Sequence, residues 1–372
     1  MEQSIYIDFV KKYFPDLVVA SVNKLNDSSR PLSYTYRRFL TPSYSVDGRW
    51  ASVTGKYTRV AADIVAVNSP LPLIKRDSVE SASGTLPKLG VKMTLNEQQM
   101  QDLDALIALS AQNGGRNLNQ ALQILFEDTP KVIEAVYERL EMEFLQGLSS
   151  GAALADAGNK GVATRINYGF KAENQFLAKT AVWEGNPQTA KPFDDIKQII
   201  DKAEEDGNVV VRVFADDNWI DAACASEQVR AYSAFAVSNG SIANVATIPV
   251  LDREQLAQAL SRKYNIELVR VNRSIRTEID GVQTSIKPWK KGSATFVCDD
   301  VVGDLVWANC AESNHRAENV TYQTVDDFIL LSKYHHNDPI EEATASQARV
   351  VPVISNVDRI YTLDSTTVAE GE

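Results

Sequence analysis

The strongest pattern of hydrophobic and polar positions lies between residues 130 and 147. Hydrophobic side chains recur there at steps of three and four residues, the spacing of one face of an α-helix. Thr129 and Pro130 precede them as an N-cap and a first-turn proline. We therefore expect a long helix over 130–147, with its charged residues, Glu141 and Glu143 among them, on the opposite face. The predicted core stripe is Ile133, Val136, Tyr137, Leu140, Phe144 and Leu145.

Residues 192–312 alternate between helical and strand-like patterns. A helix opens at Asp194-Asp195 and ends at Gly207, and an apolar strand follows over 209–214. Asp252 with Gln255 three residues later forms a capping-box pattern for a helix that runs to residue 264. Asp280-Gly281 suits the tight turn of a hairpin over 276–286. This order predicts an α/β unit.

The flanking segments have simpler patterns. Residues 96–126 are helical with a break at Asn113-Gly114-Gly115, whereas 150–190 have an extended pattern. Beyond residue 322, strands are predicted at 328–331, 348–355 and 359–363, with a loop at 339–342. Before residue 48, only a short helix over 5–14 is predicted.

Residues 50–94 show no helical period. Imperfect alternation over 57–67, a turn signal at 68–72 and a second extended run over 86–94 predict a two-stranded excursion. Half of this segment, at about 3.3 Å per residue, reaches up to about 70 Å. A body of this length has a radius of gyration of only about 20 Å. Because an isolated ribbon is marginally stable in water, we expect it to lie on another chain.

Composition and charge narrow the function classes. The chain has 372 residues, 44% of them hydrophobic, which suits about two globular domains and excludes wholesale disorder. Its net charge is −11, which disfavours a generally basic nucleic-acid binder. Residues 1–60 instead carry nine basic and five acidic residues, a balance of +4. Such an arm suits docking on acidic neighbours or phosphates, and a solvated, mobile terminus is the alternative.

Signals of catalysis, metal binding or membrane insertion are missing. The three cysteines form no C-x-x-C pair, which indicates reduced thiols, and neither a signal peptide nor a membrane span is expected. No dinucleotide, phosphate-loop, nucleophile-elbow or zinc-protease motif occurs. We interpret His335-His336 as polar loop residues rather than metal ligands. Four acidic pairs are interpreted as caps and turns rather than as a two-metal site: Asp194-Asp195, Asp216-Asp217, Asp299-Asp300 and Asp326-Asp327.

The order of these parts resembles the lambda-type major head protein E family of tailed-phage capsid proteins. The resemblance covers about residues 45–365, and its strength lies in the joint order of several short segments. The segments are GTLPKLG at 84–90, LEMEFLQGLSSG at 140–151, PFDDI at 192–196, DNW at 217–219, EIDGV at 278–282, IKPW at 286–289, VPV at 351–353 and DRIY at 358–361.

The resemblance implies the Hong Kong 97-type α+β capsid fold. Its parts are an N-terminal arm (1–48), an extended loop (49–95), a peripheral domain (96–191 and 318–372) with a spine helix at 130–147, and an axial α/β domain (192–317). The implied function is not enzymatic: copies assemble as hexamers and pentamers into an icosahedral shell around phage double-stranded DNA.

Further implications concern partners and location. The resemblance implies portal, scaffold and decoration proteins as partners, weak non-specific contact with packaged DNA, and no cofactor, metal or membrane. The protein is expected to assemble and mature as a procapsid in the host cytoplasm and to reside in the virion. We expect the inter-subunit contacts to involve residues of the arm and the extended loop: Arg37, Arg38, Val65, Val67, Leu71, Leu73, Ile74, Lys75 and Lys88.

Three questions stay open at this point. Some relatives cross-link a loop lysine to an asparagine, but solvated or salt-bridged lysines are the favoured interpretation of Lys75 and Lys88. An encapsulin-like compartment would share the fold but enclose protein cargo. A two-domain α/β enzyme with a ligand at the strand ends of 192–312 is a third reading, and the missing motifs and the scarcity of histidine count against it.

Overall fold

The computed structural model describes residues 2–26, 34–55, 79–112, 118–154, 165–238, 248–279 and 281–369. These residues fall into two compact units. Unit 1 comprises residues 1–50, 84–142 and 305–352, and unit 2 comprises 51–83, 143–304 and 353–372. Five elements contribute residues to both units: β2 (Arg49–Gly55), β3 (Val79–Thr85), α5 (Asp128–Ser150), β13 (Gly303–Ala308) and β16 (Ile340–Ile354).

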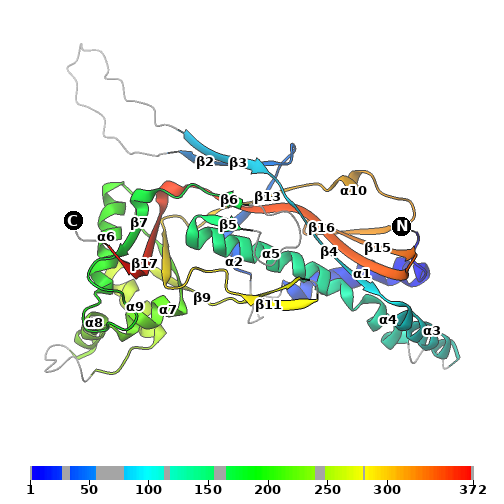
Figure 1. The fold of residues 1–372 in the computed structure, drawn as a ribbon, viewed down its shortest axis with the longest axis horizontal. Helices are drawn as coiled ribbons and strands as arrows, with labels where there is room; N and C mark the ends of the chain where they lie inside the picture. Colours follow the sequence, from blue (N-terminus) through cyan, green and yellow to red (C-terminus); the bar gives the residue numbers. More distant parts are fainter. Residues whose placement is uncertain are drawn as a thin grey trace, which may run out of the picture. The chain divides into compact units, whose positions relative to one another are not determined.

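Unit 1 is built on a six-stranded sheet, ordered β1-β13-β16-β15-β14, with β4 also paired to β16 (Figure 1). Its other strands are β1 (Leu40–Tyr44), β4 (Lys88–Leu95), β14 (Thr321–Val325) and β15 (Ile329–Asn337). Its helices, besides the first part of α5, are α1 (Ile7–Leu25), α2 (Thr35–Phe39), α3 (Glu97–Gln112), α4 (Leu118–Phe126) and α10 (Ala311–Asn314).

The predicted loop at 339–342 is wrong. The β15–β16 ladder continues to Asn337 opposite Ile340, so only Asp338 and Pro339 form the turn. His335 and His336, which were also predicted to lie in a loop, belong to β15 and pair with β16. Several polar side chains of β16 are buried in the sheet: Ser346, for example, is 2% exposed and donates from Oγ to the carbonyl oxygen of Val132 at 2.7 Å. Buried polar groups of this kind break the alternation by which a strand is usually recognised.

The long helix is confirmed as α5, and every residue of its predicted core stripe is buried. The face opposite this stripe is also buried in part, because Glu141 and Glu143 are only 0% and 3% exposed. In unit 1, α2 lies against this face, and Glu141 Oε2 accepts a hydrogen bond from the backbone nitrogen of Tyr36 at 3.1 Å. The N-terminal helix is also longer than predicted, because α1 continues through Pro15 and buries Val18 and Leu25.

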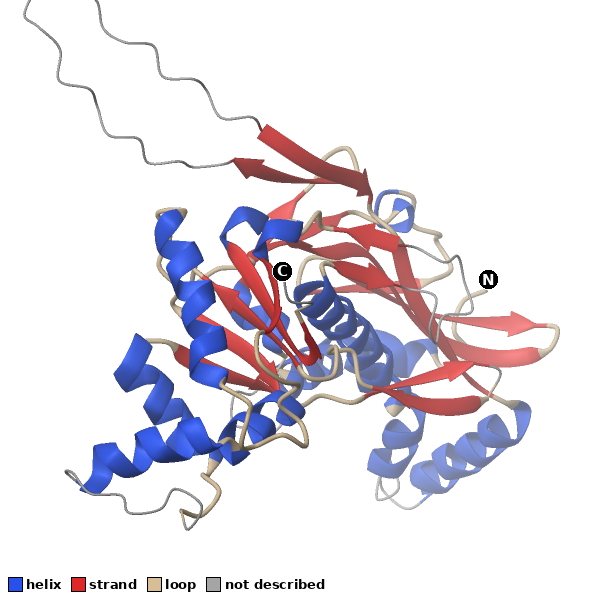
Figure 2. Ribbon diagram, turned by 60° about the vertical axis from the view of Figure 1, so that its left-hand side comes forward, coloured by secondary structure: helices blue, strands red, loops and turns tan. Residues whose placement is uncertain are grey.

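Unit 2 is built on a five-stranded sheet, ordered β7-β17-β12-β8-β9. Its strands are β7 (Gln175–Ala178), β8 (Arg212–Asp216), β9 (Glu267–Val271), β12 (Ser293–Val297) and β17 (Ile360–Val368). Its helices α6 (Pro192–Glu205), α7 (Asp217–Ala225), α8 (Glu227–Ser238) and α9 (Arg253–Tyr264) pack against this sheet (Figure 2). Unit 2 also contains a small strand pair, β5 (Ala152–Leu154) with β6 (Arg165–Asn167), and a hairpin, β10 (Ile275–Ile279) with β11 (Val282–Ile286).

The local patterns in unit 2 match the structure closely. Asp252 and Gln255 form the predicted capping box of α9, and Gly207 ends α6 with a φ of 74°. The hairpin turns at Gly281, which has a φ of 78°, whereas Asp280 lies outside the described residues. β7 and β17, whose residues were predicted to belong to the peripheral domain, join β12 in one sheet. This arrangement depends on pairing between strands far apart in sequence, which local periodicity does not indicate.

Candidate assembly interface

The extended loop is present as a two-stranded ribbon of β2 (Arg49–Gly55) and β3 (Val79–Thr85). Among the described residues, this ribbon pairs with no third strand (Figure 1). The predicted return strand does not belong to it: β4 lies in the sheet of unit 1, with Leu95 opposite Glu342 and Lys88 opposite Arg349. The described part of the ribbon is therefore 49–55 and 79–85, and the ribbon does not continue to residue 95 as predicted.

The ribbon is anchored by a small cluster that we call the loop base, made of Gly48, Trp50, Gly84, Leu86 and Arg349. Trp50 is 5% exposed and Leu86 is 4% exposed. The backbone nitrogen of Leu86 donates to the carbonyl oxygen of Gly48 at 2.9 Å, which ties the outgoing chain to the returning chain. Both passes of the chain are therefore fixed where the ribbon begins.

The predicted contact residues have different surroundings. Val65, Val67, Leu71, Leu73, Ile74 and Lys75 lie outside the described residues. Lys88 forms an ion pair with Glu312, with 2.6 Å between Nζ and Oε1. The guanidinium of Arg38 lies 5.2 Å from the centre of the Phe39 ring. The participation of all these residues in inter-subunit contacts stays a prediction.

Arg37 is held within its own chain. Its Nη2 lies 2.6 Å from Asp326 Oδ2, and its guanidinium lies 4.2 Å from the centre of the Tyr137 ring. Tyr137 donates to the same carboxylate oxygen at 2.6 Å. Burial raises the pKa of the Tyr137 phenol, so it stays a hydrogen-bond donor at neutral pH. These contacts fasten α2 to α5 and to the turn between β14 and β15.

The first residues of the chain pack against β15 and β16 within unit 1, which sequence patterns did not predict. Glu2 and His335 exchange two backbone hydrogen bonds of 3.0 and 3.1 Å, and Asn337 Nδ2 donates to Glu2 Oε1 at 2.6 Å. Ser4 donates to the buried carboxylate of Glu342. Burial raises the pKa of this carboxyl group above its usual value. Short polar residues in an irregular segment carry no periodic signal, so only the structure reveals this docking.

The four acidic pairs have different roles. Asp216 caps α7 by accepting from the backbone nitrogen of Trp219 at 3.1 Å, as predicted. Asp195 is buried inside the first turn of α6 and accepts from Trp183 Nε1 at 2.8 Å. Asp299 pairs with Arg359. Asp326 and Asp327 form a turn with left-handed φ values of 48° and 65°. A cap explains the pair Asp216-Asp217, and a turn explains the pair Asp326-Asp327.

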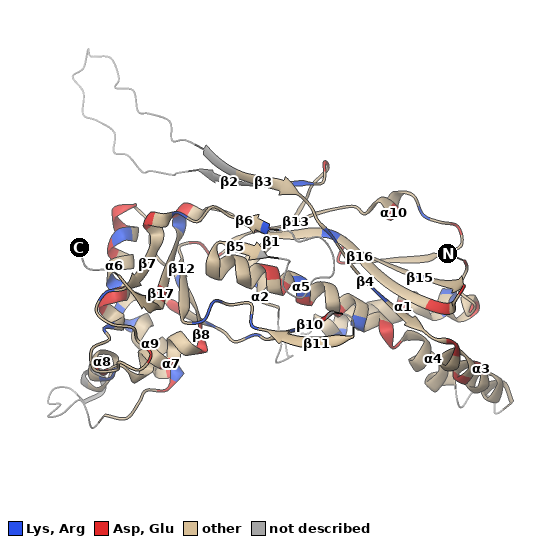
Figure 3. Cartoon of the chain, in the orientation of Figure 1, with Lys and Arg blue, Asp and Glu red and all other residues tan. Residues whose placement is uncertain are grey.

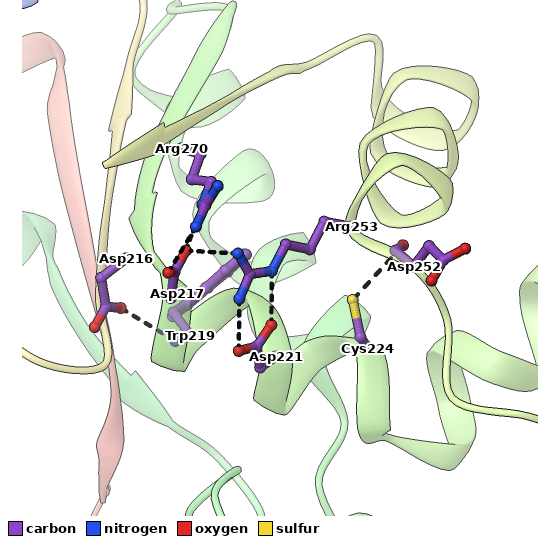
Figure 4. A network of polar contacts seen from close by, with 8 residues as sticks. All are labelled: Asp216, Asp217, Trp219, Asp221, Cys224, Asp252, Arg253 and Arg270. Atoms are coloured by element: carbon purple, nitrogen blue, oxygen red, sulfur yellow. Dashed lines mark hydrogen bonds and ion pairs between the residues drawn. The ribbon is translucent and has the colours of Figure 1, made fainter. Parts of the chain in front are cut away.

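A charged network joins α7, α9 and β9 in unit 2 (Figure 4). Asp217 Oδ1 lies 2.5 Å from Arg270 Nε and 3.1 Å from Arg253 Nη1, and Arg253 also pairs with Asp221 at 2.9 Å. The hydrogen bond from Arg270 lowers the pKa of Asp217. These groups satisfy one another, so the network fastens elements together.

Other charges in unit 2 are also matched locally. Acidic and basic side chains alternate along α6, where Lys197 pairs with Asp201 and Lys202 pairs with Asp206 (Figure 3). No group of three or more His, Cys, Asp or Glu side chains within the described ranges is arranged to hold a metal ion. In the same part of the chain, no helix is long and apolar enough to cross a membrane.

Comparisons with known proteins agree with the resemblance. The sequence profile of the phage major capsid protein E family matches residues 49–365. The chain shares 11% identity with a protein described as the capsid protein of a prophage of E. coli CFT073. The match covers 95% of this chain and 99% of that one with a TM-score of 0.56. At this identity, the likeness shows a common fold, the Hong Kong 97-type capsid fold.

Two further structures are more distant. The capsid of cyanophage A-1(L) matches at 8% identity and a TM-score of 0.47, covering 92% of this chain and 95% of its own. The mature capsid of bacteriophage PhiM1 matches at 11% identity and a TM-score of 0.42, covering 91% and 89%. Among curated proteins, none matches the chain significantly.

Proposed function

The chain belongs to the phage major capsid protein E family, and on this basis we propose how it builds a shell. The β2–β3 ribbon of each copy lies on a neighbouring copy, which supplies the contacts that the ribbon needs to be stable. As a member of this family, it is a capsid shell protein and a component of the virion.

The observation that carries this proposal is that no third strand among the described residues pairs with the β2–β3 ribbon. A two-stranded ribbon without a third strand or a covering helix is marginally stable in water, so contact with a second body stabilises it. In a shell, that second body is another copy of the chain. Contacts that pass from each copy to the next in a closed arrangement generate a container from one kind of subunit.

We further propose the contents and partners of the shell. It assembles in the host cytoplasm from hexamers and pentamers, with portal and scaffold proteins, and encloses double-stranded DNA. The net charge of −11 supports weak contact with that DNA, because a strongly basic wall would retain it through counterion release. We propose no catalytic step. Burial raises the pKa of the Cys224 thiol to about 11 and that of Cys298 to about 12, which supports unreactive thiols.

Replacing residues 56–78 by an Asn-Gly turn tests the role of the loop, because it joins β2 directly to β3. We expect a soluble, folded subunit that forms no shells in negative-stain images, whereas the unaltered chain forms closed particles. The matched control replaces residues 155–164 between β5 and β6 in the same way and should still assemble. Normal shells from the 56–78 variant would contradict the proposal. DNA protected from nuclease in particles made during infection tests the proposed contents.

A further inference from the structure

Gly48 is required at the loop base by both its backbone and its surroundings. Its φ of 68° lies in the left-handed region, which favours glycine. A Cβ atom added at Gly48 would lie 2.5 Å from Arg349 Nη2 and 3.1 Å from Arg349 Cζ. The guanidinium of Arg349 therefore rests directly against the Gly48 backbone, and its Nη2 lies 3.5 Å from the Gly48 carbonyl oxygen.

The returning chain is packed equally closely. A Cβ atom added at Gly84 would lie 2.8 Å from Trp50 Nε1, so the indole ring covers this glycine. The same Gly48 carbonyl that faces Arg349 accepts the hydrogen bond from Leu86. Arg349 thus contacts a backbone group that joins the two passes of the chain.

Arg349 lies at the end of an otherwise complete ladder. The pairing of β4 with β16 runs from Leu95 opposite Glu342 to Lys88 opposite Arg349, the last pair before the ribbon. Arg349 also lies inside β16, which pairs with β13 and β15 as well as with β4. Removing the side chain therefore leaves the backbone ladder of unit 1 intact and changes mainly the loop base.

We propose that Arg349 is a positioning residue for assembly, which holds Gly48 so that the chain leaves and re-enters unit 1 at Trp50 and Gly84 in one fixed direction. This inference rests on the proposed function of the ribbon. A ribbon held in one direction loses less conformational freedom when it docks on a neighbouring copy than a ribbon that swings about its base. Arg349 contributes to assembly by this preorganisation, with no need to touch the neighbour.

The test compares Arg349→Ala with Lys92→Ala, which removes another cation from the same two strands. Lys92 pairs with Glu341 at 2.8 Å, away from the loop base. We expect both variants to unfold at a temperature close to that of the unaltered subunit. The critical subunit concentration for assembly, measured by sedimentation, should rise about tenfold for Arg349→Ala, a change of about 1.4 kcal/mol per subunit. It should be unchanged for Lys92→Ala.

Hydrogen exchange of the Leu86 amide in unassembled subunits provides a readout that does not depend on shell formation. Arg349→Ala should speed this exchange about tenfold, since the Gly48 carbonyl loses its support, whereas Lys92→Ala should not change it. Unchanged exchange in Arg349→Ala would overturn the inference even if no shell forms from any variant. Absence of shells from the unaltered chain would instead count against the proposed function.

Two further substitutions test the same role if the Arg349→Ala variant fails to fold. Arg349→Lys keeps the charge but lacks the planar fork of the guanidinium, so an intermediate loss of assembly is expected. Gly48→Ala displaces the guanidinium from the opposite side and should reduce assembly as Arg349→Ala does. Assembly at the normal level in both variants would refute the role of Arg349.

Discussion

Lys333 on β15 is a buried lysine whose position follows from the end of a helix. It is 1% exposed, and its Nζ donates to the carbonyl oxygen of Leu125 at 2.8 Å and to Thr344 Oγ1 at 2.9 Å. Helix α4 ends at Phe126, where backbone carbonyls lack partners within the helix. The ammonium group of Lys333 supplies a hydrogen-bond partner for the carbonyl of Leu125. Sequence patterns could not show this, because an isolated lysine in an apolar strand suggests a solvent-facing position.

This burial makes stability depend on pH. Burial lowers the pKa of Lys333 to about 8, whereas an unfolded lysine has a pKa near 10.5. Between about pH 8 and about pH 10, the unfolded chain therefore binds more protons than the folded chain, and the free energy of unfolding should rise with pH. The contribution is at most about 1.4 kcal/mol per pH unit. Urea unfolding across this range measures it.

Lys333→Met is the control for this pH dependence, since it keeps the length of the side chain without a titrating group. The rise should be absent in Lys333→Met, while contributions from other groups stay the same. An equal rise in both proteins would show that Lys333 is not its source.

At the scale of elements, the end of α5 depends on a small residue. A Cβ atom added at Gly147 would lie 2.5 Å from Tyr168 Cε2 and 3.1 Å from Ile354 Cδ1. Alanine is a better helix former than glycine by about 1 kcal/mol, so an exposed position would favour the substitution. Here we expect Gly147→Ala to destabilise the protein by about 1–3 kcal/mol, since extra volume in a packed core forces its neighbours to move. Thermal unfolding measures the change, and a stabilised variant would contradict this packing.

Elements with local signals were predicted well from the sequence, and those fixed by distant contacts were not. The stripe of α5, the capping box of α9 and the hairpin turn at Gly281 depend on nearby residues, and all three are confirmed. The role of β4 could not be predicted, because it is set by pairing with β16. For the interface, the ribbon itself was predicted, whereas its anchor at Arg349 depends on a contact with Gly48 far along the chain.

At the scale of the whole molecule, the ribbon should change its properties on assembly. Backbone amides of β2 and β3 in free subunits are expected to exchange with solvent much faster than those of the β8 and β12 core strands. In assembled shells the ribbon amides should become protected by at least about tenfold, since a neighbouring copy covers them. Hydrogen exchange of the two forms measures this. Equal protection in both forms would mean that the ribbon contacts no other copy.

All three thiols of the chain, Cys224, Cys298 and Cys310, are buried, and burial raises the pKa of each. The native protein is consequently expected to react slowly with maleimide dyes at neutral pH. A cysteine introduced at Val282, which is 65% exposed on β11, would then be the one fast-labelling position. Each particle would carry one fluorophore per subunit, so its brightness would count the copies in a single shell.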